Sequence, residues 1–134
     1  MILITGGAYQ GKKKYAEDHF GILPEMWIDG RNSSREDLLS CRAVYDFHQF
    51  ILEAVRRGED LYGLPDELAG ANPDILIVMN ELGCGIIPMD EEARAWREAS
   101  GRLAEQLAER ADTVVRVLCG LGMVQKNDGV SGAT

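Results

Sequence analysis

A glycine-rich loop near the start of the chain has the spacing of a phosphate-binding site. Residues 1–5 form a short apolar run, and the loop follows at once as Gly6, Gly7, Ala8, Tyr9, Gln10, Gly11, Lys12 and Lys13. Two glycines separated by four residues and followed by lysine are typical of loops whose backbone N–H groups surround phosphate oxygens. A helix beginning near Gly11 would add its positive end, and Lys12 would reach the outer phosphates. We therefore predict that residues 6–13 bind the phosphates of a nucleotide.

Lys13 departs from this pattern, because serine or threonine usually follows the motif lysine and its hydroxyl ligates Mg²⁺. The sequence thus supports phosphate binding more strongly than it supports catalysis. The alternative is a chance glycine turn between a strand and a helix. We favour the binding site, because the motif requires a buried strand before the loop and a helix after it, and both are predicted here.

Two acidic residues follow predicted strands. Asp46 ends the predicted strand at residues 42–46, and Glu81 comes soon after the apolar run at 75–79. Because ligands bind at the carboxyl ends of parallel strands, we expect both carboxylates to act in catalysis and to hold Mg²⁺, with Glu81 also able to accept a substrate proton. The alternatives are a helix N-cap for Asp46 and a solvated loop carboxylate for Glu81.

The elements around these residues predict an α/β fold with a mainly parallel sheet. The run at 75–79 is continuously apolar, which indicates a strand covered on both faces. Strands alternate with helices along the chain, and this alternation is typical of a parallel sheet with helical layers. We expect one nucleotide-binding domain over residues 1–122. The small, polar and glycine-bearing residues toward the end indicate a flexible tail at 123–134.

Composition narrows the functional classes. The chain has 134 residues, 46% of them hydrophobic, and a net charge of −8. This charge argues against a nucleic-acid partner, and no stretch is apolar enough to span a membrane. The cysteines, Cys41, Cys84 and Cys119, are scattered and odd in number, which predicts reduced thiols in a cytoplasmic protein. We interpret His48, one turn into a predicted helix, as a partly buried structural residue.

The chain also resembles a known family at three stretches. Residues 2–8 lead to Gly11-Lys12, residues 80–88 read Asn-Glu-Leu-Gly-Cys-Gly-Ile-Ile-Pro, and the helix that follows matches through Val115. The second stretch is far more specific than the glycine loop. On these residues the chain resembles the adenosylcobinamide kinase/adenosylcobinamide-phosphate guanylyltransferases of cobalamin biosynthesis.

The resemblance implies a three-layer P-loop NTPase fold of the RecA-like kind. It further implies GTP or ATP with Mg²⁺, a corrinoid hydroxyl as phosphoryl acceptor, and a homo-oligomer such as a trimer. Family members carry GMP on a histidine ahead of the Asp46 strand, but residues 29–42 contain no histidine here. Since a phosphoramidate needs an imidazole nucleophile, we expect the kinase reaction rather than guanylyl transfer. The alternative is a nucleotide- or corrinoid-binding regulator or partner protein that lacks catalysis.

Overall fold

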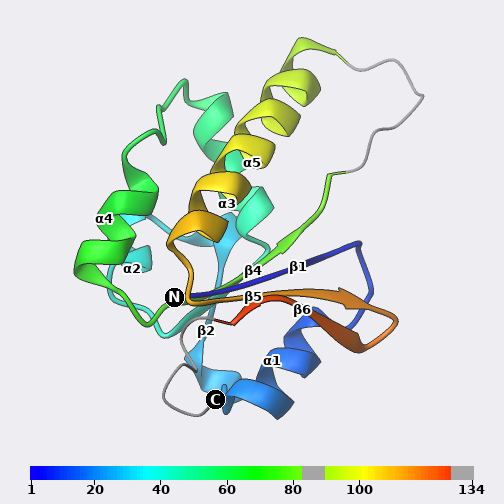
Figure 1. The fold of residues 1–134 in the computed structure, drawn as a ribbon. Helices are drawn as coiled ribbons and strands as arrows, with labels where there is room; N and C mark the ends of the chain where they lie inside the picture. Colours follow the sequence, from blue (N-terminus) through cyan, green and yellow to red (C-terminus); the bar gives the residue numbers. More distant parts are fainter. Residues whose placement is uncertain (83–89, 128–134) are drawn as a thin grey trace.

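The computed structural model describes residues 1–82 and 90–127 and is built on one sheet with the strand order β2-β3-β4-β1-β5-β6 (Figure 1). The first five strands along the chain pair in parallel, and β6 pairs antiparallel with β5. This confirms the predicted α/β fold with a mainly parallel sheet. The strands are β1 (Ile2–Gly6), β2 (Trp27–Asp29), β3 (Ala43–Tyr45), β4 (Leu76–Asn80), β5 (Thr113–Leu118) and β6 (Leu121–Asn127).

Helices cover both faces of the sheet, which gives three layers (Figure 1). One face packs against α1, and the other packs against α3, α4 and α5. Short polar caps start two of the helices: Ser34 caps α2, and Asp90 caps α5 by accepting a hydrogen bond from the Ala93 N–H at 2.8 Å. The helices are α1 (Lys12–Phe20), α2 (Arg35–Leu38), α3 (Phe47–Arg56), α4 (Leu64–Ala71) and α5 (Glu91–Arg110), with 3-10 turns η1 (Pro24–Met26) and η2 (Gly30–Asn32).

The apolar run in β4 is explained by its central place in the sheet. Side chains of a strand alternate between the two faces, so a strand covered on both sides must be apolar throughout. Ile77 packs in the core cluster that includes α3 and α5, whereas Leu76 and Val78 pack in the cluster that includes α1. All three are buried.

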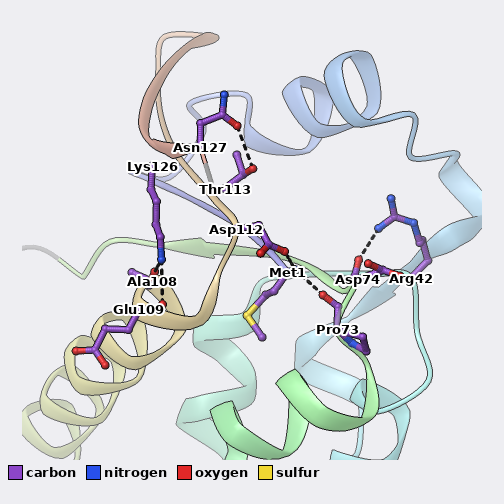
Figure 2. A network of polar contacts seen from close by, with 10 residues as sticks. All are labelled: Met1, Arg42, Pro73, Asp74, Ala108, Glu109, Asp112, Thr113, Lys126 and Asn127. Atoms are coloured by element: carbon purple, nitrogen blue, oxygen red, sulfur yellow. Dashed lines mark hydrogen bonds and ion pairs between the residues drawn. The ribbon is translucent and has the colours of Figure 1, made fainter. Parts of the chain in front are cut away.

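The amino ends of the strands are joined by polar contacts, shown in Figure 2. The ammonium of Met1 donates to the Pro73 carbonyl oxygen and to Asp112 Oδ2, the latter at 2.9 Å. Arg42, just before β3, donates from Nη1 to the Asp74 carbonyl oxygen at 2.9 Å. These contacts tie together the loops at the amino ends of the strands, and Met1, Arg42, Asp74 and Asp112 also line a cavity of about 400 Å³ there.

The end of the chain differs from the prediction. Residues 123–127, which we expected in a flexible tail, complete β6, and the rest of the predicted tail lies outside the described residues. Cys119 and Gly120 both have positive φ, 52° and 78°, and turn the chain back along β5. We did not predict β6, because its side chains are nearly all exposed. Its sequence therefore lacks the alternation of apolar and polar residues that indicates a half-buried strand. Its backbone hydrogen bonds to β5 hold it in place.

Within the described residues, none of the helices combines the length and the apolar character that a membrane crossing requires.

The packing predicts how two leucine truncations differ. Leu107 of α5 is fully buried in the core, whereas Leu121 of β6 is 73% exposed. Leu107→Ala should lower the free energy of unfolding by about 2–5 kcal/mol, since it leaves a cavity that the core cannot refill. Leu121→Ala should change it by about 0.5 kcal/mol or less. Urea unfolding followed by circular dichroism measures both, and equal losses would contradict the described core.

Candidate functional site

A cavity of about 400 Å³ opens at the carboxyl edge of the sheet, against the glycine loop. Its walls come from the loop and the start of α1, the ends of β3 and β4, the first turn of α3, and the turn η2. Its lining residues are Ala8, Tyr9, Gln10, Gly11, Lys12, Lys13, Lys14, Arg31, Tyr45, Asp46, His48, Gln49, Val78 and Asn80. Most of the predicted loop and one of the two predicted acidic residues therefore meet at one cavity.

The two glycines of the motif are required by close contacts and by backbone conformation. Gly6 ends β1, and a Cβ at this position would lie 2.4 Å from the Val117 carbonyl oxygen of β5. Gly11 immediately precedes α1 with φ of 85°, a conformation that costs glycine little. These positions let the chain leave β1 sharply and enter α1, whose first residues line the cavity.

The glycine loop is also bound to the β5–β6 turn. The Gln10 side-chain oxygen Oε1 accepts from the Cys119 N–H at 2.6 Å, and the Gln10 carbonyl oxygen accepts from the Gly120 N–H at 2.8 Å. Gln10 was predicted among the ligand-contacting residues, and its side chain is here engaged in ordering the loop. Tyr9, by contrast, is fully exposed with φ of 60°.

Lys12 lies folded back over the loop. Its side chain is only 7% exposed, and Nζ donates to the Gly7 carbonyl oxygen at 2.6 Å. Burial lowers the pKa of Lys12, and the charges of Asp46 and Glu81 act in the opposite direction. The three predicted catalytic residues are therefore close enough to interact electrostatically, although they lie on separate elements. A buried ammonium with few acceptors favours an anionic ligand beside it.

Asp46 lines the cavity and does not cap α3 with its side chain. It occupies the N-cap position of α3, but its side chain makes no capping hydrogen bond. Its φ is 52°, in the left-handed region that non-glycine residues seldom adopt. Strained residues of this kind cluster at ligand sites. Asp46 lines the cavity, so the capping alternative is not what the structure shows.

Glu81 is held differently. Arg116 of β5 donates from Nε to Oε1 at 2.8 Å and from Nη2 to Oε2 at 3.1 Å, a bidentate pair that fixes both carboxylate oxygens. Asn80, not Glu81, belongs to the cavity lining. Residues 83–88 of the specific stretch that begins at Asn80 lie outside the described residues.

Lys13 stands at the wall of the cavity with its ammonium over two aromatic rings. Nζ lies 4.0 Å from the ring centroid of Tyr45 and 5.5 Å from that of Trp27, and both are cation–π contacts. Arg31 of η2 lines the same cavity. Sequence reasoning did not find Arg31 or Tyr45, because their closeness to the loop depends on the strand order β2-β3-β4-β1 of the folded sheet. The cavity is thus rich in positive charge, although the whole chain carries −8.

His48 contacts the cavity as well, a role that the sequence did not predict. It is 4% exposed, and its Nδ1 accepts the Asn80 N–H at 3.0 Å. Because Nδ1 accepts, the neutral ring carries its proton on Nε2. Trp96 of α5 donates from Nε1 to the His48 carbonyl oxygen at 2.7 Å. In the sequence, the only sign that His48 lines the cavity was its position two residues after Asp46.

The donor groups do not fit a protein-built Mg²⁺ site. Among the described residues there is no group of three or more His, Cys, Asp or Glu side chains that could hold a metal ion. Lys13 replaces the hydroxyl ligand, and the Glu81 carboxylate is paired with Arg116 and does not line the cavity. Asp46 is the one carboxylate among the residues that line the cavity.

Comparison with known proteins adds a family to this geometry. A family model described as cobinamide kinase / cobinamide phosphate guanyltransferase (CobU) matches residues 43–124. The bifunctional adenosylcobalamin biosynthesis protein CobU of Salmonella typhimurium is 41% identical over 177 residues, which covers 92% of this chain and 98% of the relative. The alignment spans more positions than the 134 residues of this chain, so it places gaps in the sequence of this chain.

Two other relatives match over shorter stretches. The protein of the same name from Escherichia coli is 41% identical over 49 residues, 37% of this chain and 27% of its own length. The bifunctional adenosylcobalamin biosynthesis protein CobP of Pseudomonas aeruginosa is 35% identical over 54 residues, 40% of this chain and 31% of its own length.

The environment of His48 predicts a pH dependence of stability. Burial lowers its pKa below the ordinary value of 6.5, and Lys12 and Arg31 add to this effect while Asp46 opposes it. The unfolded chain therefore takes up the proton first. The stabilisation is complete above about pH 6.5 and is lost as the pH falls through the folded pKa, by at most about 1.4 kcal/mol per unit of lowering.

Urea unfolding between pH 5 and 7.5 checks this prediction. His48→Gln should show a shallower fall toward pH 5 than the unchanged chain, whereas the exposed His19→Gln should follow the unchanged chain. Parallel curves for His48→Gln and the unchanged chain would contradict the neutral, buried imidazole.

Proposed function

Since this chain belongs to the cobinamide kinase / cobinamide phosphate guanyltransferase family, we propose that it is a kinase that transfers the γ-phosphoryl group of GTP or ATP to a corrinoid hydroxyl. The observation that carries this proposal is the meeting of the glycine loop, the buried Lys12 ammonium and Asp46 at one cavity. Phosphoryl transfer needs mainly positioning and charge stabilisation, and these are the properties of that cavity.

Residues 6–13 hold the phosphates in this proposal. The backbone N–H groups of the loop and of the first turn of α1 face the phosphate oxygens. Lys12 exchanges the Gly7 carbonyl oxygen for a phosphate oxygen, which gives its buried charge an anionic partner. Such a charge-assisted hydrogen bond is stronger than the bond to a neutral carbonyl.

Asp46 acts on the acceptor. The bond between the γ-phosphorus and its bridging oxygen breaks as the acceptor oxygen bonds to phosphorus, and the acceptor proton passes to the Asp46 carboxylate. The sequence assigned proton acceptance to Glu81, but its carboxylate pairs with Arg116 and only Asp46 of the two lines the cavity, so we assign the proton to Asp46. Glu81 contributes its negative charge near Lys12. Of the two residues predicted to hold Mg²⁺, Asp46 is the better placed.

The guanylyl-transfer half of the family's chemistry is not part of the proposal. Residues 29–42 contain no histidine and form η2 and the short α2. His48 reaches the cavity, but its Nδ1 accepts a backbone N–H and its Nε2 carries the proton. Neither nitrogen then offers a lone pair to the α-phosphorus of GTP.

Assembly and location rest on the family and on composition. We propose a homo-oligomer, such as a trimer, in the cytoplasm. Sedimentation of the purified chain gives its mass in solution, and a monomer at micromolar concentration would contradict the assembly.

The kinase proposal predicts phosphorylation of cobinamide by labelled GTP or ATP. Lys12→Met should lower kcat/KM by about 10²–10³-fold, because it removes a preorganised positive charge from the developing phosphate charge. Asp46→Asn should lower kcat while nucleotide affinity is retained. Arg42→Gln removes a cation at the opposite edge of the sheet and serves as the control.

Two outcomes would contradict this proposal. Nucleotide binding without any turnover would favour the alternative of a binding or regulatory protein. Full activity of Lys12→Met would remove the glycine loop from the reaction.

A further inference from the structure

We propose that the Lys13 ammonium takes the place of the divalent cation in nucleotide binding, so that this chain binds nucleoside triphosphates without Mg²⁺. The inference rests on the proposed nucleotide site and deepens it, because it assigns a specific role to the one residue that breaks the loop pattern. The loop motif has serine or threonine as a metal ligand at this position, whereas this chain has Lys13.

The first step is the position of Lys13. A metal held by a hydroxyl at position 13 and by Asp46 would lie between the start of α1 and the end of β3. The Lys13 side chain begins on α1, and its ammonium lies 4.0 Å from the ring centroid of Tyr45, so it reaches from α1 to the last residue of β3. Asp46 is the next residue along the chain.

The second step is the charge at this wall. Arg31 lines the same cavity as Lys13, Tyr45 and His48. Lys13 and Arg31 together bring two positive charges to the wall, the formal charge of one divalent ion. Without Mg²⁺ a nucleoside triphosphate is more negative than its metal complex, and this favours binding to such a wall.

The third step is the repulsion that a metal would meet. A divalent ion at the usual position would face the Lys13 ammonium rather than a hydroxyl oxygen. Like charges a few ångströms apart oppose binding, and the Arg116 guanidinium already offsets the negative charge of Glu81. The cation–π contacts with Tyr45 and Trp27 hold the ammonium at the wall before any ligand binds.

Calorimetric titration of the full chain with GTP and ATP tests the inference, once with Mg²⁺ and once with EDTA. For the unchanged chain the two Kd values should agree within about threefold. Lys13→Ser should weaken binding in EDTA by about tenfold, the loss of one charge-assisted contact, and Mg²⁺ should restore part of it through the new hydroxyl. Lys13→Arg should behave as the unchanged chain.

Arg42→Gln is the matched control, because Arg42 precedes the same strand, β3, at the far edge of the sheet. It removes one positive charge and should leave both Kd values unchanged. If it weakens binding as much as Lys13→Ser, net charge rather than position is responsible and the inference is overturned.

The outcomes separate this inference from the proposed function. Binding by the unchanged chain that EDTA weakens tenfold or more overturns the inference and leaves the kinase proposal standing. Lys13→Ser with unchanged Kd in EDTA also overturns the inference alone. Absence of binding with and without Mg²⁺ contradicts the proposed function and the inference with it.

Discussion

The burial of the Lys12 ammonium under the glycine loop is the constraint on which the site depends. A charged group taken out of water is costly unless charges or hydrogen bonds compensate it. Here the direct acceptor is the Gly7 carbonyl oxygen, a neutral dipole, while Asp46 and Glu81 act electrostatically. An anion at the cavity would complete this compensation. The cavity wall and the hydrogen bonds between the glycine loop and the β5–β6 turn keep the Lys12 ammonium in place.

The loop keeps its shape because β5 and the turn that follows it hold the loop in place. Val117 of β5 leaves no room for a side chain at Gly6, and the turn after β5 donates two backbone hydrogen bonds to Gln10. The same strand supplies Arg116, which fixes Glu81. A preorganised loop loses less conformational entropy when a ligand binds, so β5 and its turn contribute to affinity without touching the ligand.

Local patterns in the sequence were sufficient for part of this picture. The glycine loop, the apolar run of β4 and the position of Asp46 after β3 follow from spacing and periodicity, and the structure bears out these elements. The contacts that order the site depend instead on residues far apart in the chain. Gln10 and Cys119 are 109 positions apart, and Glu81 and Arg116 are 35 apart. β6 was missed for the related reason that an exposed edge strand needs no apolar alternation.

The segment between β2 and β3 bears on both departures from the family's pattern. It consists here of η2 and the short α2. That segment carries no histidine, yet its Arg31 enters the cavity wall beside Lys13 and His48. A guanylyl carrier would need a nucleophilic lone pair there, whereas a phosphate-binding wall needs fixed positive charge. The residues that are present supply charge and a hydrogen-bond donor, so this end of the cavity is suited to holding phosphates rather than to covalent chemistry.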